Sequence, residues 1–316
     1  MLIAWLMLII GLALLVKGAD WFVDSASGLA ARMGVSPLVI GLTIVAFGTS
    51  APEAAVSITS SLRGSNGIAI GNIVGSNLFN LLVVVGASAL IRPCRVDNAI
   101  IKKDFPFSIL ATVVLIFTML DRFFGDLPVM VISRSDGMII LAFFVVFMYY
   151  TVASAISEKS QPAEEGDKKP LWLLTVMAVI GITAVVLGGQ SVVRGASDVA
   201  RAFGVSEDLI GLTIVAVGTS LPELVTSVVA VRKGEDNIAI GNVVGSNIFN
   251  LLFIVGMGAG ISAIKVNGAM LTDALALLAV NLLFYAYIAG KRTVSRQAGA
   301  AMIAVYAAYM FFAVTR

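Results

Sequence analysis

Residues 41–86 and 211–256 are near-copies of each other at a constant offset of 170 positions. The first copy reads GLTIVAFGTSAPEAAVS…GNIVGSNLFNLLVVVG and the second GLTIVAVGTSLPELVTS…GNVVGSNIFNLLFIVG. The two align without a gap, and about 28 of 46 positions are identical. Each copy carries a glutamate at the same position of the motif, Glu53 or Glu223, inside an otherwise apolar stretch. A duplicated polar motif of this kind indicates a site built from two related halves.

The composition of the chain places these motifs in a membrane. Of its 316 residues, 59% are hydrophobic and only 13% are charged, which is far too apolar for a soluble domain. Apolar runs of about 17–25 residues recur along the chain, and each can cross a bilayer core of ~30 Å. The net charge of +2 is too small to suggest nucleic acid as a partner. Histidine is absent and Cys94 is the lone cysteine, so imidazole chemistry and an internal disulfide are excluded.

The hydropathy pattern predicts an all-α polytopic membrane protein with ten transmembrane helices. The expected spans are 2–28, 37–62, 67–91, 105–121, 136–156, 171–197, 207–231, 237–263, 270–289 and 297–315. Residues 157–170 (SEKSQPAEEGDKKP) form a short charged linker. They separate a first five-helix half, 1–156, from a second, 171–316. Because five is odd, the halves enter the membrane from opposite sides and form two inverted five-helix repeats.

The distribution of basic residues predicts the orientation in the membrane. Of the 21 lysines and arginines, thirteen fall in loops on the side of the linker and seven on the other side, while Lys17 lies within the first span. Because basic residues favour the cytoplasm, we expect the linker inside the cell and both termini outside, in the inner (plasma) membrane.

The GTSAPE motif at 48–53 is predicted to interrupt its helix near the bilayer midplane. Pro52 has no N–H to donate and its ring crowds the preceding turn, so backbone oxygens near Ala46–Thr49 are expected to lack helical partners. Spacings of three and four residues put two hydroxyls on the face of the carboxylate. These residues are Thr49, Ser50 and Glu53, and their counterparts in GTSLPE are Thr219, Ser220 and Glu223.

The second motif, GNIVGSNLFN at 71–80, lies in the middle of the next span. Its two glycines are spaced for close approach to a neighbouring helix. Ser76 and Asn80 are spaced to face the same cavity as Glu53. The counterparts are Gly241, Gly245, Ser246 and Asn250. The remaining asparagines, Asn72, Asn77, Asn242 and Asn247, suit hydrogen bonding between helices as well as contact with an ion.

These groups together predict a cation site with Glu53 and Glu223 at its centre. No basic residue in these spans can neutralise the glutamates, and an isolated carboxylate at membrane depth costs several kcal/mol. Carboxylates, hydroxyls and carbonyls are hard oxygen ligands, which favour Ca²⁺, Na⁺ or K⁺ over Zn²⁺, copper or iron–sulfur clusters. Two carboxylates balance one Ca²⁺ or two Na⁺ equally well, and this is the physical basis of antiport. No cofactor is expected, and the expected partners are these ions and the lipid bilayer, with no obligate protein partner.

The pairs GTSAPE/GTSLPE and GSNLFN/GSNIFN resemble the α-repeats of the cation/Ca²⁺ exchanger superfamily, specifically its prokaryotic Na⁺/Ca²⁺ exchanger branch. The resemblance covers nearly the whole chain. It implies that helices 2, 3, 7 and 8 enclose the site while helices 1 and 6 slide to alternate access. It also implies Glu53 and Glu223 as central Ca²⁺ and Na⁺ ligands, with backbone oxygens of Thr49 and Thr219 on Ca²⁺. The implied flanking Na⁺ ligands are Ser50, Ser220, Ser76, Ser246 and the carbonyls of Ala46 and Ala216.

One departure from the family pattern concerns the last residue of each repeat motif. Better-studied Na⁺/Ca²⁺ exchangers usually have Asn in the first copy and Asp in the second, whereas this chain has Asn80 and Asn250. The missing ionisable group leaves open a Ca²⁺/H⁺ exchanger or a K⁺-dependent Na⁺/Ca²⁺ exchanger, although the GNxxE pattern typical of Ca²⁺/H⁺ exchangers is absent. A passive channel also stays open. An intramembrane serine protease is excluded because no base is available to Ser50 or Ser220.

Overall fold

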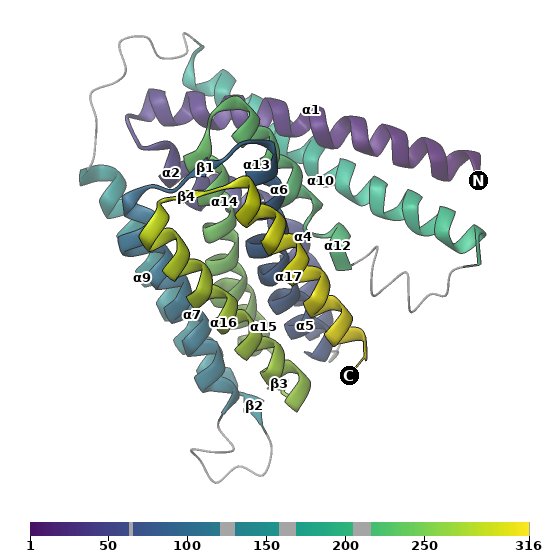
Figure 1. The fold of residues 1–316 in the computed structure, drawn as a ribbon, viewed down its shortest axis with the longest axis vertical. Helices are drawn as coiled ribbons and strands as arrows, with labels where there is room; N and C mark the ends of the chain where they lie inside the picture. The colour runs from purple at the N-terminus through teal and green to yellow at the C-terminus, as the bar shows by residue number, and fades with distance from the viewer. Residues whose placement is uncertain (63–65, 121–129, 158–168, 205–215, 316) are drawn as a thin grey trace.

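The computed structural model describes residues 1–62, 66–120, 130–157, 169–204 and 216–315, and these are almost entirely helical (Figure 1). The helical elements of the first half are α1 (Leu2–Met33), α2 (Pro37–Ile40), η1 (Gly41–Val45), α3 (Ala46–Thr49), α4 (Ala51–Leu62), α5 (Asn66–Phe79), η2 (Asn80–Val84), α6 (Val85–Ile91), η3 (Ile100–Asp104), α7 (Phe105–Met119) and α9 (Arg134–Ser157). Those of the second half are α10 (Leu171–Ala202), α12 (Ala216–Gly218), α13 (Leu221–Lys233), α14 (Asp236–Ile248), η5 (Phe249–Ile254), α15 (Val255–Ile261), α16 (Gly268–Lys291) and α17 (Arg296–Thr315). Segments labelled η are π-helical turns.

Within the described residues, seven helices are long and apolar enough to cross a membrane. An eighth span is obtained if the pair Pro37–Thr49 and Ala51–Leu62, bent by 51°, is taken as one broken helix. Two of the ten expected spans are not among these eight. The α-helix at the expected span 105–121 ends at Met119 after 15 residues and follows the π-helical η3, and the expected span 207–231 begins outside the described residues.

Burial separates central helices from peripheral ones. In the most apolar stretch of each span, the share of residues buried inside the protein is 94% for Asp236–Ile261 and 78% for Ile70–Ile91. For Arg296–Thr315 this share is only 6%. The two central spans carry the GNxVGSN motifs, so these motifs lie in the protein core. Large apolar side chains such as Phe311 and Leu283, each 73% exposed, face outward, as expected for a surface covered by lipid.

Helices α1 and α10 lie side by side and cross the remaining helices at a steep angle (Figure 1). Glycines permit this close packing: a Cβ atom at Gly18 would lie 2.8 Å from the carbonyl oxygen of Gly181, and one at Gly188 would lie 2.6 Å from the amide nitrogen of Leu15. These contacts are backbone to backbone, so any larger residue would separate the helices. Helices α1 and α10 therefore form a closely packed pair beside the other helices of the bundle.

Short strands mark the two ends of the bundle. Strand β1 (Cys94–Arg95) pairs antiparallel with β4 (Thr293–Val294), and β2 (Val131–Ile132) pairs antiparallel with β3 (Ile264–Lys265). Strands β1 and β3 occupy equivalent repeat positions, 170 residues apart, yet they lie at opposite ends of the molecule (Figure 1). The central spans α5–α6 and α14–α15 accordingly run in opposite directions.

Candidate cation site

Both GTSxPE motifs interrupt a helix at their serine. Ser50 (φ −82°, ψ 7°) separates α3 from α4, and Thr219 together with Ser220 (φ −91°, ψ 8°) separates α12 from α13. Two residues later, a proline lies in the first turn of the next helix. A residue there has no helical partner for its N–H, so the missing N–H of proline costs no hydrogen bond. The interruption predicted from Pro52 is therefore present, with the bend at Ser50.

The expectation of free backbone oxygens is wrong for Ala46. Its carbonyl accepts hydrogen bonds from Ser50 N (3.0 Å), Thr49 Oγ1 (3.3 Å) and Ser246 Oγ (3.4 Å). The hydrogen bond from Ser50 N to the Ala46 carbonyl is still formed because the helix remains regular up to Ser50 and bends only there. Hydroxyl groups from two helices thus converge on this carbonyl.

The two motifs meet through crossed hydrogen bonds. Ser50 Oγ donates to Glu223 Oε1 at 2.8 Å, and Ser220 Oγ donates to Glu53 Oε1 at 2.9 Å. Both glutamates are 0% exposed. Each half therefore supplies the hydroxyl that binds the carboxylate of the other half, so the duplicated motifs form one centre.

Four buried carboxylate and amide oxygens of this centre have no hydrogen-bond donor among the described residues. They are Oε2 of Glu53, Oε2 of Glu223, Oδ1 of Asn80 and Oδ1 of Asn250. The described lysines and arginines form their ion pairs elsewhere. An unsatisfied buried acceptor costs about 1–3 kcal/mol, and more when it carries charge. Two pairs of such oxygens, related by the repeat, are a ligand set that a desolvated cation would satisfy.

The amide groups of four asparagines fix the orientation of the site. Asn80 Nδ2 donates to Asn247 Oδ1 at 3.2 Å, and Asn250 Nδ2 donates to Asn77 Oδ1 at 2.9 Å. Asn77 and Asn247 also donate to each other's backbone carbonyls, at 3.2 and 3.4 Å. Because the Nδ2 atoms of Asn80 and Asn250 donate to other asparagines, the Oδ1 atoms of these two residues are the amide atoms that could bind an ion.

The other two motif asparagines also bond between helices. Asn72 Nδ2 donates to Ser57 Oγ at 3.1 Å, and Asn242 Nδ2 donates to Ser227 Oγ at 2.9 Å. For all four asparagines whose role the sequence left open, the structure thus shows helix-to-helix hydrogen bonds. Ser57 and Ser227 were not predicted from the sequence. Each lies four residues after a glutamate, a spacing that could have identified it, but its hydroxyl binds a motif asparagine rather than the carboxylate.

The remaining predicted residues surround this centre. Ser76 Oγ lies 3.1 Å from Ser220 Oγ, Thr49 Oγ1 lies 3.0 Å from Asn242 Oδ1, and Thr219 is half-buried with no partner for its hydroxyl among the described residues. Ala216 begins α12, and its side chain lies outside the described part of the structure. No group of three or more His, Cys, Asp or Glu placed to hold a metal ion occurs within the described ranges. The set is therefore two carboxylates with neutral oxygens, which suits Ca²⁺ or Na⁺.

Comparison with known proteins gives the same family as the motifs. The family described as sodium/calcium exchanger protein matches residues 3–153 and 173–315. The chain belongs to the sodium/calcium exchanger family. Its similarity to the prokaryotic branch, inferred from the GTSxPE and GSNxFN motifs, is confirmed by the relatives and structures below.

Three relatives of this exchanger-family chain cover most of its length. It is 38% identical to the putative antiporter CaxA of Alkalimonas amylolytica (98% of both chains) and 36% identical to the inner membrane protein YrbG of Escherichia coli (90% of this chain, 88% of the relative). It is 32% identical to the sodium/calcium exchanger MaX1 of Methanosarcina acetivorans (97% of both). The sodium-calcium exchanger NCX_Mj, soaked with 10 mM Na⁺ and zero Ca²⁺, superposes with a TM-score of 0.85 at 31% identity over 100% of this chain and 99% of the other.

The glycines of the second motif bring the centre of the exchanger together. A Cβ atom at Gly245 would lie 2.5 Å from the carbonyl oxygen of Leu42, and one at Gly241 would lie 3.0 Å from that of Leu38. These contacts confirm the predicted close approach, here between α14 and the α2–η1 segment. At Gly71 and Gly75 no described atom lies within 4 Å, and the segment of the second half equivalent to 38–45, residues 208–215, lies outside the described residues.

Two π-helical turns at the site were not predicted. Asn80 is the first residue of η2, and Asn250 is the second residue of η5. Inserting a residue into the α-helical ladder turns the side chains near the bulge, and such bulges occur frequently at functional sites. Nothing in the hydrophobic periodicity of LFNLLVVVG distinguishes a π-turn from a regular helix.

Proposed function

We propose that this protein is a secondary active antiporter that exchanges Na⁺ for Ca²⁺ by alternating access at the centre between α3–α4 and α12–α13. The observation that carries this proposal is the crossed pair Ser50–Glu223 and Ser220–Glu53, next to four buried oxygens with no described donor. Two carboxylates and neutral oxygens can replace the hydration shell of one Ca²⁺ or two Na⁺. Competition of the two ions for the same oxygens couples their fluxes.

The proposed roles of the residues follow from their positions. Glu53 and Glu223 are the central ligands of both ions, with Asn80 and Asn250 beside them. The proposed neighbouring ligands are Thr49, Thr219, Ser50, Ser220, Ser76, Ser246 and the carbonyls of Ala46 and Ala216. The hydroxyls of Ser50 and Ser220 donate hydrogen bonds to the carboxylates, so a cation that binds the carboxylates would compete with these hydrogen bonds.

The proposed architecture is ten transmembrane helices in two inverted halves, 1–156 and 171–316, joined by the linker 157–170. The opposite positions of β1 and β3 and the opposite directions of the two central spans support it. The distribution of lysine and arginine favours a cytoplasmic linker and extracytoplasmic termini. Location in the inner membrane is supported by the name of the relative YrbG.

A K⁺-dependent exchanger or a Ca²⁺/H⁺ exchanger is the alternative within the same superfamily. The shorter similarity to sodium/potassium/calcium exchanger 1 of chicken, 33% identity over 158 residues and 47% of this chain, favours the K⁺-dependent form. Asn80 and Asn250 add neutral oxygens rather than charge, which suits a second monovalent ion. In such a K⁺-dependent exchanger, Glu53 and Glu223 would still be the only two carboxylates proposed at the centre.

The test is ⁴⁵Ca²⁺ uptake into proteoliposomes loaded with Na⁺ and diluted into Na⁺-free medium. Uptake that depends on the Na⁺ gradient, and persists when K⁺ is omitted and a protonophore is added, supports Na⁺/Ca²⁺ exchange. A strict need for K⁺ selects the K⁺-dependent form. Uptake driven by an imposed pH gradient but not by Na⁺ would refute the proposal in favour of Ca²⁺/H⁺ exchange.

A further inference from the structure

The two repeat-related faces of the α1–α10 pair differ in how they contact the rest of the protein. A cavity of about 210 Å³ lies between α4 and α10, lined by Val56 on one side and Val193 on the other, and it reaches Thr219 at the break before α13. Val56 is 37% exposed. The repeat equivalents of these two valines are Thr226 on α13 and Val23 on α1, and both are 0% exposed. The α4–α10 face is therefore open while the α1–α13 face is closed.

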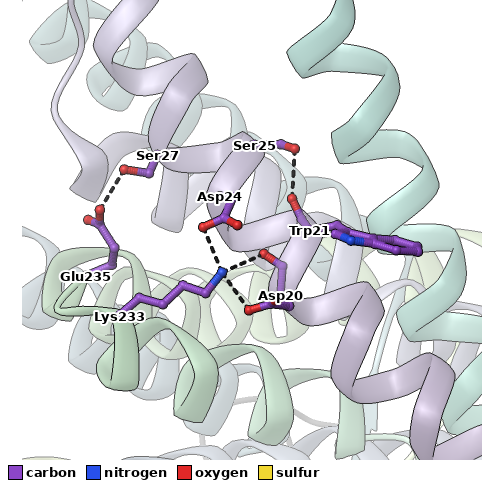
Figure 2. Close-up of polar contacts among 7 residues, drawn as sticks. All are labelled: Asp20, Trp21, Asp24, Ser25, Ser27, Lys233 and Glu235. Atoms are coloured by element: carbon purple, nitrogen blue, oxygen red, sulfur yellow. Dashed lines mark hydrogen bonds and ion pairs between the residues drawn. The ribbon is translucent and has the colours of Figure 1, made fainter. Parts of the chain in front are cut away.

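Ion pairs connect α1 and α13 at the closed face. Lys233, the last residue of α13, places its Nζ 2.6 Å from Asp20 Oδ1 and 2.7 Å from Asp24 Oδ1, and donates to the backbone carbonyl of Asp20 at 3.0 Å (Figure 2). Beside it, Ser27 Oγ donates to Glu235 Oε1 at 2.6 Å (Figure 2). One lysine therefore bridges two aspartates that lie a helical turn apart on α1.

The open face lacks the residues needed for the same contacts. At an offset of 170, Asp20 corresponds to Gln190 and Asp24 to Arg194. Lys233 corresponds to Arg63 and Glu235 to Ser65. An arginine at each of the equivalent positions, 63 and 194, cannot form the ion pair that Lys233 forms with Asp24. Ser197, the equivalent of Ser27, has a buried hydroxyl with no partner among the described residues.

We propose that Asp20, Asp24 and Lys233 form an ion-pair latch that holds α1 against α13, so that the transporter rests with its α4–α10 face open. The proposal rests on alternating access, the proposed function above. Inverted halves of equal sequence would have equal resting energies for the two open states, so a preference must come from positions where the halves differ. The latch is such a position, and it must break before the α1–α13 face can open.

The size of the expected effect follows from the exposure of the partners. The side chains are 26% exposed for Lys233, 39% for Asp20 and 53% for Asp24. Solvent screens partly exposed pairs, so two of them shift a two-state equilibrium by about three- to tenfold rather than by orders of magnitude. Loss of the latch should therefore change the balance between the open states without preventing folding.

The experiment uses a cysteine reporter on each face of the full-length protein, purified in detergent with Cys94 replaced by Ala. Thr226→Cys reports opening of the α1–α13 face and Val56→Cys reports the α4–α10 face, each through its rate of modification by a small methanethiosulfonate reagent. Each reporter is combined with Lys233→Ala, and separately with Arg232→Ala. Arg232 is the matched control because it removes the same charge one residue earlier and makes no ion pair among the described residues.

We expect Lys233→Ala to raise the modification rate of Thr226→Cys by about three- to tenfold. Arg232→Ala should change this rate much less, because Arg232 forms no ion pair with Asp20 or Asp24. Asp24→Asn, which is nearly isosteric, should act in the same direction, and the exchange Asp24→Lys with Lys233→Asp should restore slow modification. Equal rates in Lys233→Ala and Arg232→Ala, or no restoration by the exchanged pair, would overturn the latch. Modification does not require transport. If the protein shows the expected modification rates but no Na⁺-driven Ca²⁺ flux, the proposed function is contradicted and the latch is not.

Discussion

The hydroxyl of Ser50 lies 2.8 Å from a carboxylate oxygen of Glu223, a residue 173 positions further along the chain. The equivalent contact joins Ser220 to Glu53 at 2.9 Å. Each glutamate is thus held by the opposite repeat, so neither half can form the centre alone. Any movement of one broken helix relative to the other changes the surroundings of both carboxylates together, which is what coupled binding of two kinds of ion needs.

The unpaired oxygen of Asn80 should contribute to ion affinity. In Asn80→Ala one of the four free oxygens is lost, so we expect Ca²⁺ affinity to fall by about tenfold, since affinity follows the number and charge of the ligands. The measurement is the rise in Tm with Ca²⁺ concentration in detergent. Ser57→Ala is the control, because Ser57 is equally buried but bonds Asn72 rather than the centre. Equal responses of both variants to Ca²⁺ would count against a ligand role for Asn80.

The contact at Gly245 should tolerate no side chain. A Cβ atom there would meet the backbone oxygen of Leu42 at 2.5 Å, and backbone cannot swing aside. We expect Gly245→Ala to destabilise the protein by about 1–3 kcal/mol through overpacking. Gly290→Ala, where no described atom lies within 4 Å, should be neutral or slightly stabilising. Thermal unfolding of the two purified variants measures this difference, and a stable Gly245→Ala protein would show that α14 and η1 pack less closely than described.

The native thiol should be unreactive near neutral pH. Burial, with a smaller contribution from the Asp236 carboxylate, raises the pKa of the Cys94 thiol to about 12, and its Sγ lies 3.3 Å from the carbonyl oxygen of Arg92. Because the thiolate is the reactive form, a raised pKa lowers the reactive fraction at every pH below it. Maleimide labelling of the folded protein should be slow at pH 7–8 and still rising with pH at pH 10, whereas unfolded protein should label fast. Rapid labelling of folded protein at pH 7 would contradict the burial of Cys94.

Much of the centre follows from sequence because two motifs repeat in register. The offset of 170 is enough to pair Glu53 with Glu223, and the need to satisfy a buried carboxylate is enough to predict a cation site. The helix interruption at the GTSxPE motif follows from proline chemistry. Gly241 and Gly245 were predicted to allow close packing because small residues at this spacing serve that purpose in membranes, and the structure shows the contact.

Other features depend on tertiary contacts that the sequence does not encode locally. The hydrogen bond from Ser50 to Glu223 can be predicted only if it is known that the two broken helices lie next to each other. The carbonyl of Ala46 keeps its helical partner because the bend falls at Ser50, a detail that proline alone does not determine. The π-turns at Asn80 and Asn250 leave no trace in hydrophobic periodicity, since nearly every neighbouring residue is apolar. Lys233 and Asp20 are 213 positions apart, and only the fold brings them together.

We propose that Glu53 and Glu223 bind the transported ion together. Na⁺-gradient-driven ⁴⁵Ca²⁺ uptake into proteoliposomes, compared between wild type, Glu53→Gln, Glu223→Gln and the control Ser57→Ala, tests it most directly. Each glutamine variant keeps the size and hydrogen-bonding oxygen of the side chain but removes one of the two charges that balance Ca²⁺. We expect uptake to fall by at least about tenfold in both glutamine variants and to be retained in Ser57→Ala. A fully active Glu223→Gln protein would contradict the paired-carboxylate site.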